Sequence, residues 1–395
     1  MRSTAIHRLA FGAILGAFIA MACQATPITP LRDDEVIDVL PRTAAAAAGA
    51  RGDERRARQQ HALNPRDAGL ALGIAKRELA RAHELGDPRY AGRALAAIGA
   101  WNDDDANAPG EVLLMRATVQ QYLHEFDAAA ATLQRLLSRR DVQNQPQAWL
   151  TLATVRRVQG RYADSDSACR RVAAAGAALH GAACLAENAA LRGESERARA
   201  MLNGLLATPR LENGTRAWLL TTLAELEQRA GRDDASDAAY RAALQAEPRD
   251  DYARLAYADF LIDQKRPAQA LAVLKPQVRS DAVLLRLAMA GQQAGTAQAA
   301  ADAAEMRERI AVANERPDAK RFHGREQAMF ALWVERDPAR ALALARGNVA
   351  QQREPLDLLV YAQAARQSGQ GSARREAQRL ADEVGLRDAR VQALL

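Results

Sequence analysis

The apolar positions of this chain recur with helical spacing over most of its length, and they do so in pairs of segments. Between Ala217 and Asp250 the apolar residues mark two amphipathic helices that break at Gly231 and stop at Pro248. The stretch that follows repeats the same plan, so the unit is 34 residues long. We therefore expect successive antiparallel helix pairs from about residue 65 to the end of the chain.

Turns between the paired helices are predicted at nine positions, spaced 30 to 41 residues apart. Glycine dominates among them because a residue that ends a helix often needs a positive φ. The predicted turns lie near Gly86, His124, Gly160, Gly193, Gly231, Lys265, Gly295, Arg336 and Gly369.

Two of the best-formed units carry large, small and turn residues at regular offsets: one has Trp149, Leu152, Ala153, Gly160 and Tyr162, and the other has Leu223, Ala224, Gly231, Tyr240, Ala243 and Pro248. This layout resembles the tetratricopeptide repeat (TPR), in which small residues let two helices cross closely. Ser165 and Ser236 depart from it, since the family usually has alanine there. The resemblance covers residues 65–395 and implies an all-α, right-handed α-solenoid of about eight or nine TPR-like helix–turn–helix repeats. The sequence resembles secreted bacterial TPR proteins whose task is undefined.

The N-terminus has the pattern of a secretory signal peptide, which we place at residues 1–25. Two arginines precede an apolar run from Leu9 to Ala22 that is too short for a comfortable membrane span. Small residues allow cleavage after Ala22 or after Ala25. The mature protein is therefore expected in the periplasm or outside the cell.

Cys23 allows a second interpretation of the same segment. A cysteine directly after small residues resembles the lipobox of bacterial lipoproteins, although Ala20 and Met21 fit that pattern imperfectly. Ordinary cleavage and acylation of Cys23 in an outer-membrane lipoprotein both remain open. A lipid anchor at Cys23 is the membrane contact that we expect, if there is one.

Residues 26–64 lack repeat character and form an Ala/Pro-rich lead-in segment that we expect to start extended and to become helical. Its basic run from Arg51 to Arg58 is interrupted by acids. Removal of the two N-terminal arginines lowers the formal charge from +6 to +4, and both signs are interspersed along the chain. A nucleic-acid partner is therefore not expected.

Cys169 and Cys184 lie on neighbouring predicted helices, seven and eight residues from a turn near Gly176. An antiparallel hairpin would place them at the same height. In an oxidising compartment this arrangement predicts a disulfide, provided that both face the shared seam. The alternative is a pair of buried thiols.

No catalytic or metal-binding motif occurs in the sequence. HExxH, GxSxG, GxxxxGK and paired CxxC patterns are missing, and the six histidines are scattered without ligand spacing. We expect no enzyme activity, no cofactor and no metal.

The resemblance to TPR arrays implies a concave groove lined by the first helix of each pair, and such grooves usually bind extended peptides or a helix of a partner. Transferring the inner-row offsets unit by unit predicts Gln121, Arg157, Glu187, Trp218, Glu225, Gln228, Tyr252, Asp259, Phe330, Trp333 and Arg366 as groove residues. Trp218 and Trp333 could equally pack between repeats.

The function that follows is a non-catalytic envelope scaffold that binds a partner protein or extended peptide through this groove. An alternative is a polysaccharide-binding or exopolysaccharide-export accessory protein. A continuous positive groove would favour the polysaccharide, whereas mixed charges and aromatic rings would favour a peptide.

Overall fold

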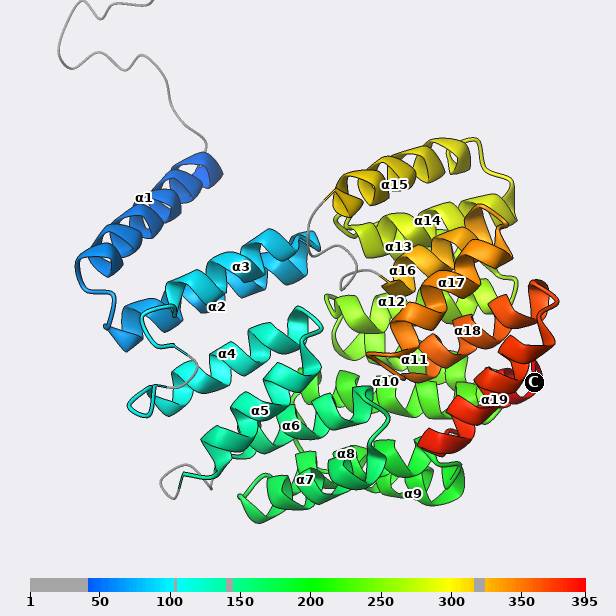
Figure 1. Cartoon of the computed structure of the whole chain (residues 1–395), viewed down its shortest axis with the longest axis horizontal. Helices are drawn as coiled ribbons and strands as arrows, with labels where there is room; N and C mark the ends of the chain where they lie inside the picture. Colours follow the sequence, from blue (N-terminus) through cyan, green and yellow to red (C-terminus); the bar gives the residue numbers. More distant parts are fainter. Residues whose placement is uncertain (1–41, 103–104, 140–144, 316–323) are drawn as a thin grey trace, which may run out of the picture. The chain divides into compact units, whose positions relative to one another are not determined.

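A computed structural model of the chain describes residues 42–102, 105–139, 145–315 and 324–395, which are helices joined by turns (Figure 1). The predicted signal peptide and Cys23 lie outside these residues. The chain divides into two units, Met1–Arg55 and Arg56–Leu395. In the first unit the described backbone belongs to the start of α1 (Arg42–Leu63), where an alanine run gives high helix propensity. No described helix is both long and apolar enough to cross a membrane.

The second unit consists of helical hairpins whose members pack against each other in chain order (Figure 1). The prediction of about eight or nine repeats is confirmed, with nine hairpins in the described ranges. They are α2 (Ala68–Leu85) with α3 (Pro88–Ala97), α4 (Gly110–Tyr122) with α5 (Phe126–Leu137), α6 (Pro146–Val158) with α7 (Tyr162–Ala174), α8 (Ala178–Leu191) with α9 (Ser195–Leu206), α10 (Asn213–Arg229) with α11 (Asp233–Ala246), α12 (Asp251–Asp263) with α13 (Pro267–Leu274), α14 (Asp281–Ala294) with α15 (Ala299–Asn314), α16 (Gly324–Met329) and η3 (Phe330–Val334) with α17 (Pro338–Val349), and α18 (Pro355–Gln367) with α19 (Gly371–Val384). A short α20 (Ala389–Gln392) follows.

The nine predicted turn residues all have positive φ, between 57° and 83°, so this prediction is confirmed. Three of them are not glycine: His124, Lys265 and Arg336 adopt the left-handed conformation despite their Cβ atoms. The turn geometry is therefore imposed by the packing of the hairpin and not by glycine alone.

The two serines that replace alanine in the second helix of a hairpin are completely buried. The hydroxyl of Ser236 donates to the carbonyl of Ala224 on the facing helix, at 2.9 Å, and Ser165 accepts from Asn188 Nδ2, also at 2.9 Å. A small side chain is required at the crossing, and the hydroxyl is tolerated because the neighbouring helix satisfies it.

The eighth hairpin contains a π-helical turn, η3. The amide of Glu335 donates to the carbonyl of Phe330, five residues back, at 3.0 Å. This inserts an extra residue into the helix and rotates the positions that surround it relative to an uninterrupted α-helix.

The C-terminal hairpins pack back onto the turns of two earlier hairpins. The amide of Arg353 donates to the carbonyl of Val158 at 2.7 Å, and the amide of Arg387 donates to the carbonyl of Leu191 at 2.8 Å. Val158 and Leu191 are the last residues of α6 and α8, where carbonyls have no partner within their own helix. The distal hairpins therefore satisfy the ends of helices that precede them by about 200 residues.

Gly160 provides a test of this closing contact. A Cβ at Gly160 would lie 2.4 Å from Val384 Cγ1, whereas one at Gly369, with nearly the same φ, would meet nothing within 4 Å. Gly369→Ala should cost about 1–2 kcal/mol for the left-handed conformation. Gly160→Ala should cost about 1–3 kcal/mol more because of the overlap with α19. Urea denaturation of both variants measures the difference, and equal costs would contradict the closing contact.

Candidate functional site

A cavity of about 300 Å³, which we call the inner cavity, is lined mostly by residues from the first helices of the hairpins. Its wall includes side chains from α6, α7, α8, α10, α11, α12, α14, α16, η3, α18 and α20. Seven of the predicted groove residues line it, namely Arg157, Glu187, Glu225, Gln228, Tyr252, Asp259 and Trp333.

A larger space of about 860 Å³, the outer basin, adjoins the inner cavity. Both are bordered by Leu255, Ala282 and Glu326. The outer basin lies among the ends of α2 and α4 and the turns that precede α12 and α14, and predicted residue Gln121 lines it. The two spaces therefore lie next to each other, and we call them together the groove.

Three predicted groove residues lie elsewhere. Phe330 is 1% exposed and belongs to the core, so its assignment to the groove is wrong; it is the first residue of η3, where the transferred offset no longer selects the inner face. Trp218 stacks on His180 with ring centroids 5.7 Å apart and packs against an apolar cluster, as the alternative interpretation expected. Arg366 donates to the carbonyl of Ala393 at an exposed position and does not line the inner cavity.

Ion pairs between arginines and acidic residues cover much of the cavity wall. Arg157 pairs with Glu187 at 3.0 Å, Arg286 with Asp259 at 2.5 Å, and Arg390 with Asp263 at 3.6 Å. Arg325 binds Glu354 and also Asp357, which tethers α16 to α18. The wall is mixed in charge and has no continuous positive face.

Tyr252 and Glu225 make a direct polar contact in the wall of the inner cavity. The Tyr252 hydroxyl donates to Glu225 Oε1 at 2.5 Å, and Arg229 Nη1 lies 3.9 Å from Glu225 Oε2. Burial raises the pKa of Glu225, although Arg229 opposes the shift. The charge of Glu225, followed by burial, raises the pKa of Tyr252 well above its usual value, so the phenol stays protonated. Tyr252 is 65% exposed and borders the inner cavity.

Sequence analysis missed several wall residues, above all Tyr162, Arg229, Asp263 and Arg286. A signal was available for two of them: Arg229 and Asp263 follow predicted residues Glu225 and Asp259 by four positions and therefore share their helix faces.

The charged residues that line the inner cavity are arginines and acids. Histidine, serine, cysteine and lysine do not occur among the described residues that line the inner cavity, and its carboxylates are matched by arginines. Within the described ranges, no group of three or more His, Cys, Asp and Glu side chains could hold a metal ion.

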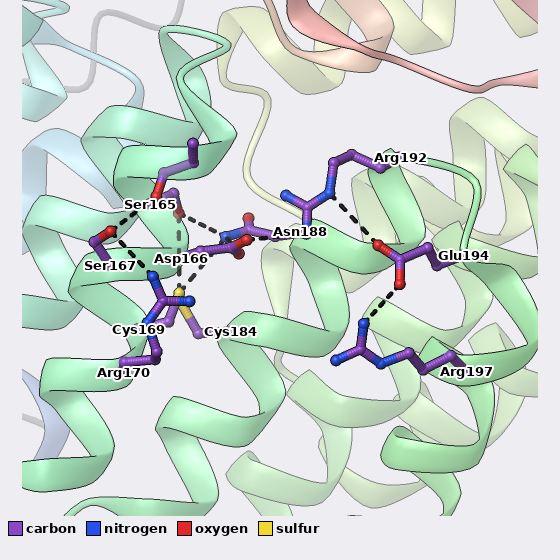
Figure 2. Close-up of polar contacts among 11 residues, drawn as sticks. Ser165, Asp166, Ser167, Cys169, Arg170, Cys184, Asn188, Arg192, Glu194 and Arg197 are labelled. Atoms are coloured by element: carbon purple, nitrogen blue, oxygen red, sulfur yellow. Dashed lines mark hydrogen bonds and ion pairs between the residues drawn. A yellow bond between two sulfur atoms is a disulfide. The ribbon is translucent and has the colours of Figure 1, made fainter.

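Cys169 on α7 and Cys184 on α8 are joined by a disulfide, with their Cα atoms 5.6 Å apart (Figure 2). Asn188, one turn further along α8, donates to Ser165 Oγ and to Asp166 Oδ1, both at 2.9 Å. These bonds fix α8 against α7, and α8 presents Glu187 to the inner cavity.

The chain was compared with protein families, curated proteins and solved structures. No family model matches the sequence, and a search of curated proteins finds no match. One similar solved structure is the TPR protein TTC0263 of Thermus thermophilus, with 21% identity over 49% of this chain and 97% of that one and a TM-score of 0.38. A TPR protein of Parabacteroides merdae has 13% identity over 69% of this chain and 98% of that one, with a TM-score of 0.36. A Rap protein complexed with competence and sporulation factor has 12% identity over 87% of this chain and 94% of that one, with a TM-score of 0.48. The chain is TPR-like, and its own nine hairpins and their turns are the basis for that statement.

Asp263 predicts a pH dependence of stability. Burial raises its pKa from 3.8 to about 6, so between these values the folded state binds more protons than the unfolded state. The contribution of Asp263 to the free energy of unfolding is therefore complete below pH 4 and is lost as the pH rises through 6. Asp263→Asn, which cannot ionise, should be more stable than the wild type at pH 7.5 and equal to it near pH 4. The gain should be less than the ~1.4 kcal/mol of one pK unit, because the carboxylate keeps partial solvent contact. Urea denaturation across this range would refute the prediction if the difference stayed constant.

The disulfide closes a loop with a sequence separation of 15 residues. Cys169→Ala/Cys184→Ala should therefore lower the free energy of unfolding by about 3 kcal/mol. Chemical denaturation of the wild type with and without reductant provides the control, since reduction removes the bond but keeps the sulfur atoms. No change on reduction would argue against a stabilising bond.

Proposed function

We propose that this chain is a non-catalytic scaffold of the bacterial envelope that binds an extended peptide segment of a partner protein in its groove. The observation that supports this best is that the inner cavity and the outer basin share Leu255, Ala282 and Glu326 in their walls. An extended chain advances about 3.3–3.6 Å per residue, so a few residues can run from one space into the other. A compact metabolite would need only the inner cavity, whose volume is at the low end for small-molecule sites.

The composition of the wall supports a peptide over an anionic polysaccharide. Tyr252 and Trp333 offer aromatic surface, and Leu191, Leu255 and Leu359 offer aliphatic surface. Five arginines line the inner cavity, but acids face the same space in similar number, namely Glu187, Glu225, Asp259, Asp263, Glu326 and Glu354. Such a wall can bind both the polar groups of a peptide backbone and apolar side chains, whereas it would repel a polyanion at many points.

The envelope location in this proposal is supported by the N-terminal sequence pattern of residues 1–25 and by the disulfide. Disulfides are stable in oxidising compartments such as the periplasm and rare in the cytosol. Whether the mature chain is soluble in the periplasm or anchored through Cys23 is left open by the proposal.

Selection of random peptides displayed on phage against residues 26–395 tests the function. The wild type should enrich a consensus peptide. A Tyr252→Ala/Trp333→Ala variant should bind it at least about tenfold more weakly, because large aromatic side chains dominate binding energy at such surfaces. Fluorescence polarisation of the labelled peptide measures the affinity.

Trp218→Ala is the matched control, because Trp218 is an aromatic residue of the same array that does not line the inner cavity. Each variant is first checked for unchanged helicity by circular dichroism. Failure to enrich any peptide would refute the proposed function, and equal losses in the control and the double variant would move the binding surface away from the groove.

A further inference from the structure

We propose that residues 386–395, which we call the C-terminal strap, form a releasable closure that controls access to the inner cavity. The strap follows α19, contains α20 and contributes Arg390 to the wall of that cavity. It would act on any ligand that enters the cavity, and it therefore goes beyond the peptide-binding role proposed above.

The strap crosses the turns of the fourth and fifth hairpins and reaches the sixth. The amide of Arg387 donates to the last carbonyl of α8 at 2.8 Å. A Cβ at Gly231, in the turn of the fifth hairpin, would lie 4.0 Å from the Cβ of Ala389. Arg390 Nη1 lies 3.6 Å from a carboxylate oxygen of Asp263, the last residue of α12. One segment therefore contacts three successive hairpins.

These contacts restrain hairpins that an array otherwise couples only to their neighbours. A segment that contacts the fourth, fifth and sixth hairpins limits the rotation of each relative to the next. Their first helices, α8, α10 and α12, all line the inner cavity. Release of the strap removes this restraint and opens the side of the cavity to which Arg390 and Asp263 belong.

The strap is attached to its own hairpin by contacts that release would leave intact. α20 packs against α18. The guanidinium of Arg366 donates to the carbonyl of Ala393 at 3.1 Å, and that of Arg374 donates to the carbonyl of Leu395 at 2.8 Å. On the opposite side, the contacts with α8 and α12 are a backbone hydrogen bond and an ion pair longer than a hydrogen bond. Water can replace both at a small net cost.

Opposing contributions keep the closed and the open state in balance. Leu386 and Val391 are each 2% exposed, in an apolar cluster that joins α18 and α19 to the hairpins that the strap crosses. Their burial favours the closed state, so the open state is the minor one. Asp263 acts in the other direction: burial raises its pKa to about 6 although Arg390 opposes the shift. At neutral pH its carboxylate is therefore charged at a position that disfavours the charge.

A disulfide that pins the strap to the fifth hairpin tests the closure. The 4.0 Å between the Cβ positions of residues 231 and 389 falls within the range that a disulfide spans. Position 231 has a positive φ, but three other turns of the array carry residues with a Cβ in this conformation. Oxidised Gly231→Cys/Ala389→Cys is the locked form. Gly231→Ser/Ala389→Ser is the matched control, since serine has a similar size and forms no bond.

The measurement is the rate at which a bulky maleimide labels a cysteine in the cavity wall, introduced as Met289→Cys into residues 26–395 of both forms. Met289 lines the inner cavity and is 6% exposed, so labelling requires an opening. The serine control should be labelled at least about tenfold faster than the locked form, because it still opens locally. Met329→Cys, at another buried wall position, repeats the measurement, so that a folding defect in one variant does not decide the result.

Leu202→Cys reports global unfolding in the same two forms, because Leu202 is completely buried in α9 and does not line the cavity. In the serine control it should be labelled more slowly than Met289→Cys, and the lock should change its rate much less. Peptide mapping without reductant confirms the engineered disulfide and the intact bond between Cys169 and Cys184.

Three results would overturn the closure. Equal labelling of Met289→Cys in the locked and control forms would show that the strap does not control access. Labelling of the control no faster than that of Leu202→Cys would show that the strap does not open in the folded protein. An equal slowdown at both positions would show that the lock only stabilises the fold. No peptide enters the measurement, so its failure leaves the proposed function standing, and failure of the phage selection leaves the closure standing.

Discussion

The left-handed turn between paired helices is the constraint on which the structure depends. At nine positions, from Gly86 to Gly369, one residue with positive φ ends a helix and directs its successor back antiparallel. Because His124, Lys265 and Arg336 adopt this conformation although their Cβ atoms disfavour it, the hairpin geometry outweighs the local preference of the residue. Each turn also leaves carbonyls at the end of the first helix without partners from that helix. These carbonyls become binding positions for other parts of the chain.

Two of those helix ends explain how a repeat array comes to have an enclosed cavity. The carbonyls of Val158 and Leu191 accept amides from Arg353 and Arg387, which brings the distal hairpins against the middle ones. An open solenoid would present its first helices to solvent as a shallow surface. Here the start of α18 and the short α20 add Glu354 and Arg390 to the wall of the inner cavity. The missing Cβ of Gly160 permits this approach, so one residue serves both the turn and the closure.

Sequence analysis predicted what depends on local periodicity and missed what depends on how distant hairpins meet. The all-α repeat class and the nine turns follow from spacing alone, and seven groove residues lie where the offsets place them. Phe330 was assigned wrongly because the extra residue of η3 breaks the register that the transfer assumes. Trp218 and Arg366 face neighbouring helices or the C-terminus, which periodicity within one unit does not specify. Nothing in the sequence indicated that residues near 353 and 387 would pack on α6 and α8.

The ion pairs of the cavity wall raise the question of why the wall is polar at all. Stability alone would favour apolar residues at these positions, because exchanging a buried ion pair for well-packed hydrophobic residues is often neutral or stabilising. The pairs of Arg157 with Glu187 and of Arg286 with Asp259 could be explained as fixing the register of neighbouring helices. Even so, Arg157 Nη1, Arg286 Nε and Asp259 Oδ1 have no hydrogen-bond partner in the described chain, and the same holds for Nε and Nη2 of Arg229. The fold therefore satisfies the polar groups of this wall only in part, which lowers stability. A wall that lowers stability in this way is consistent with the binding role proposed above.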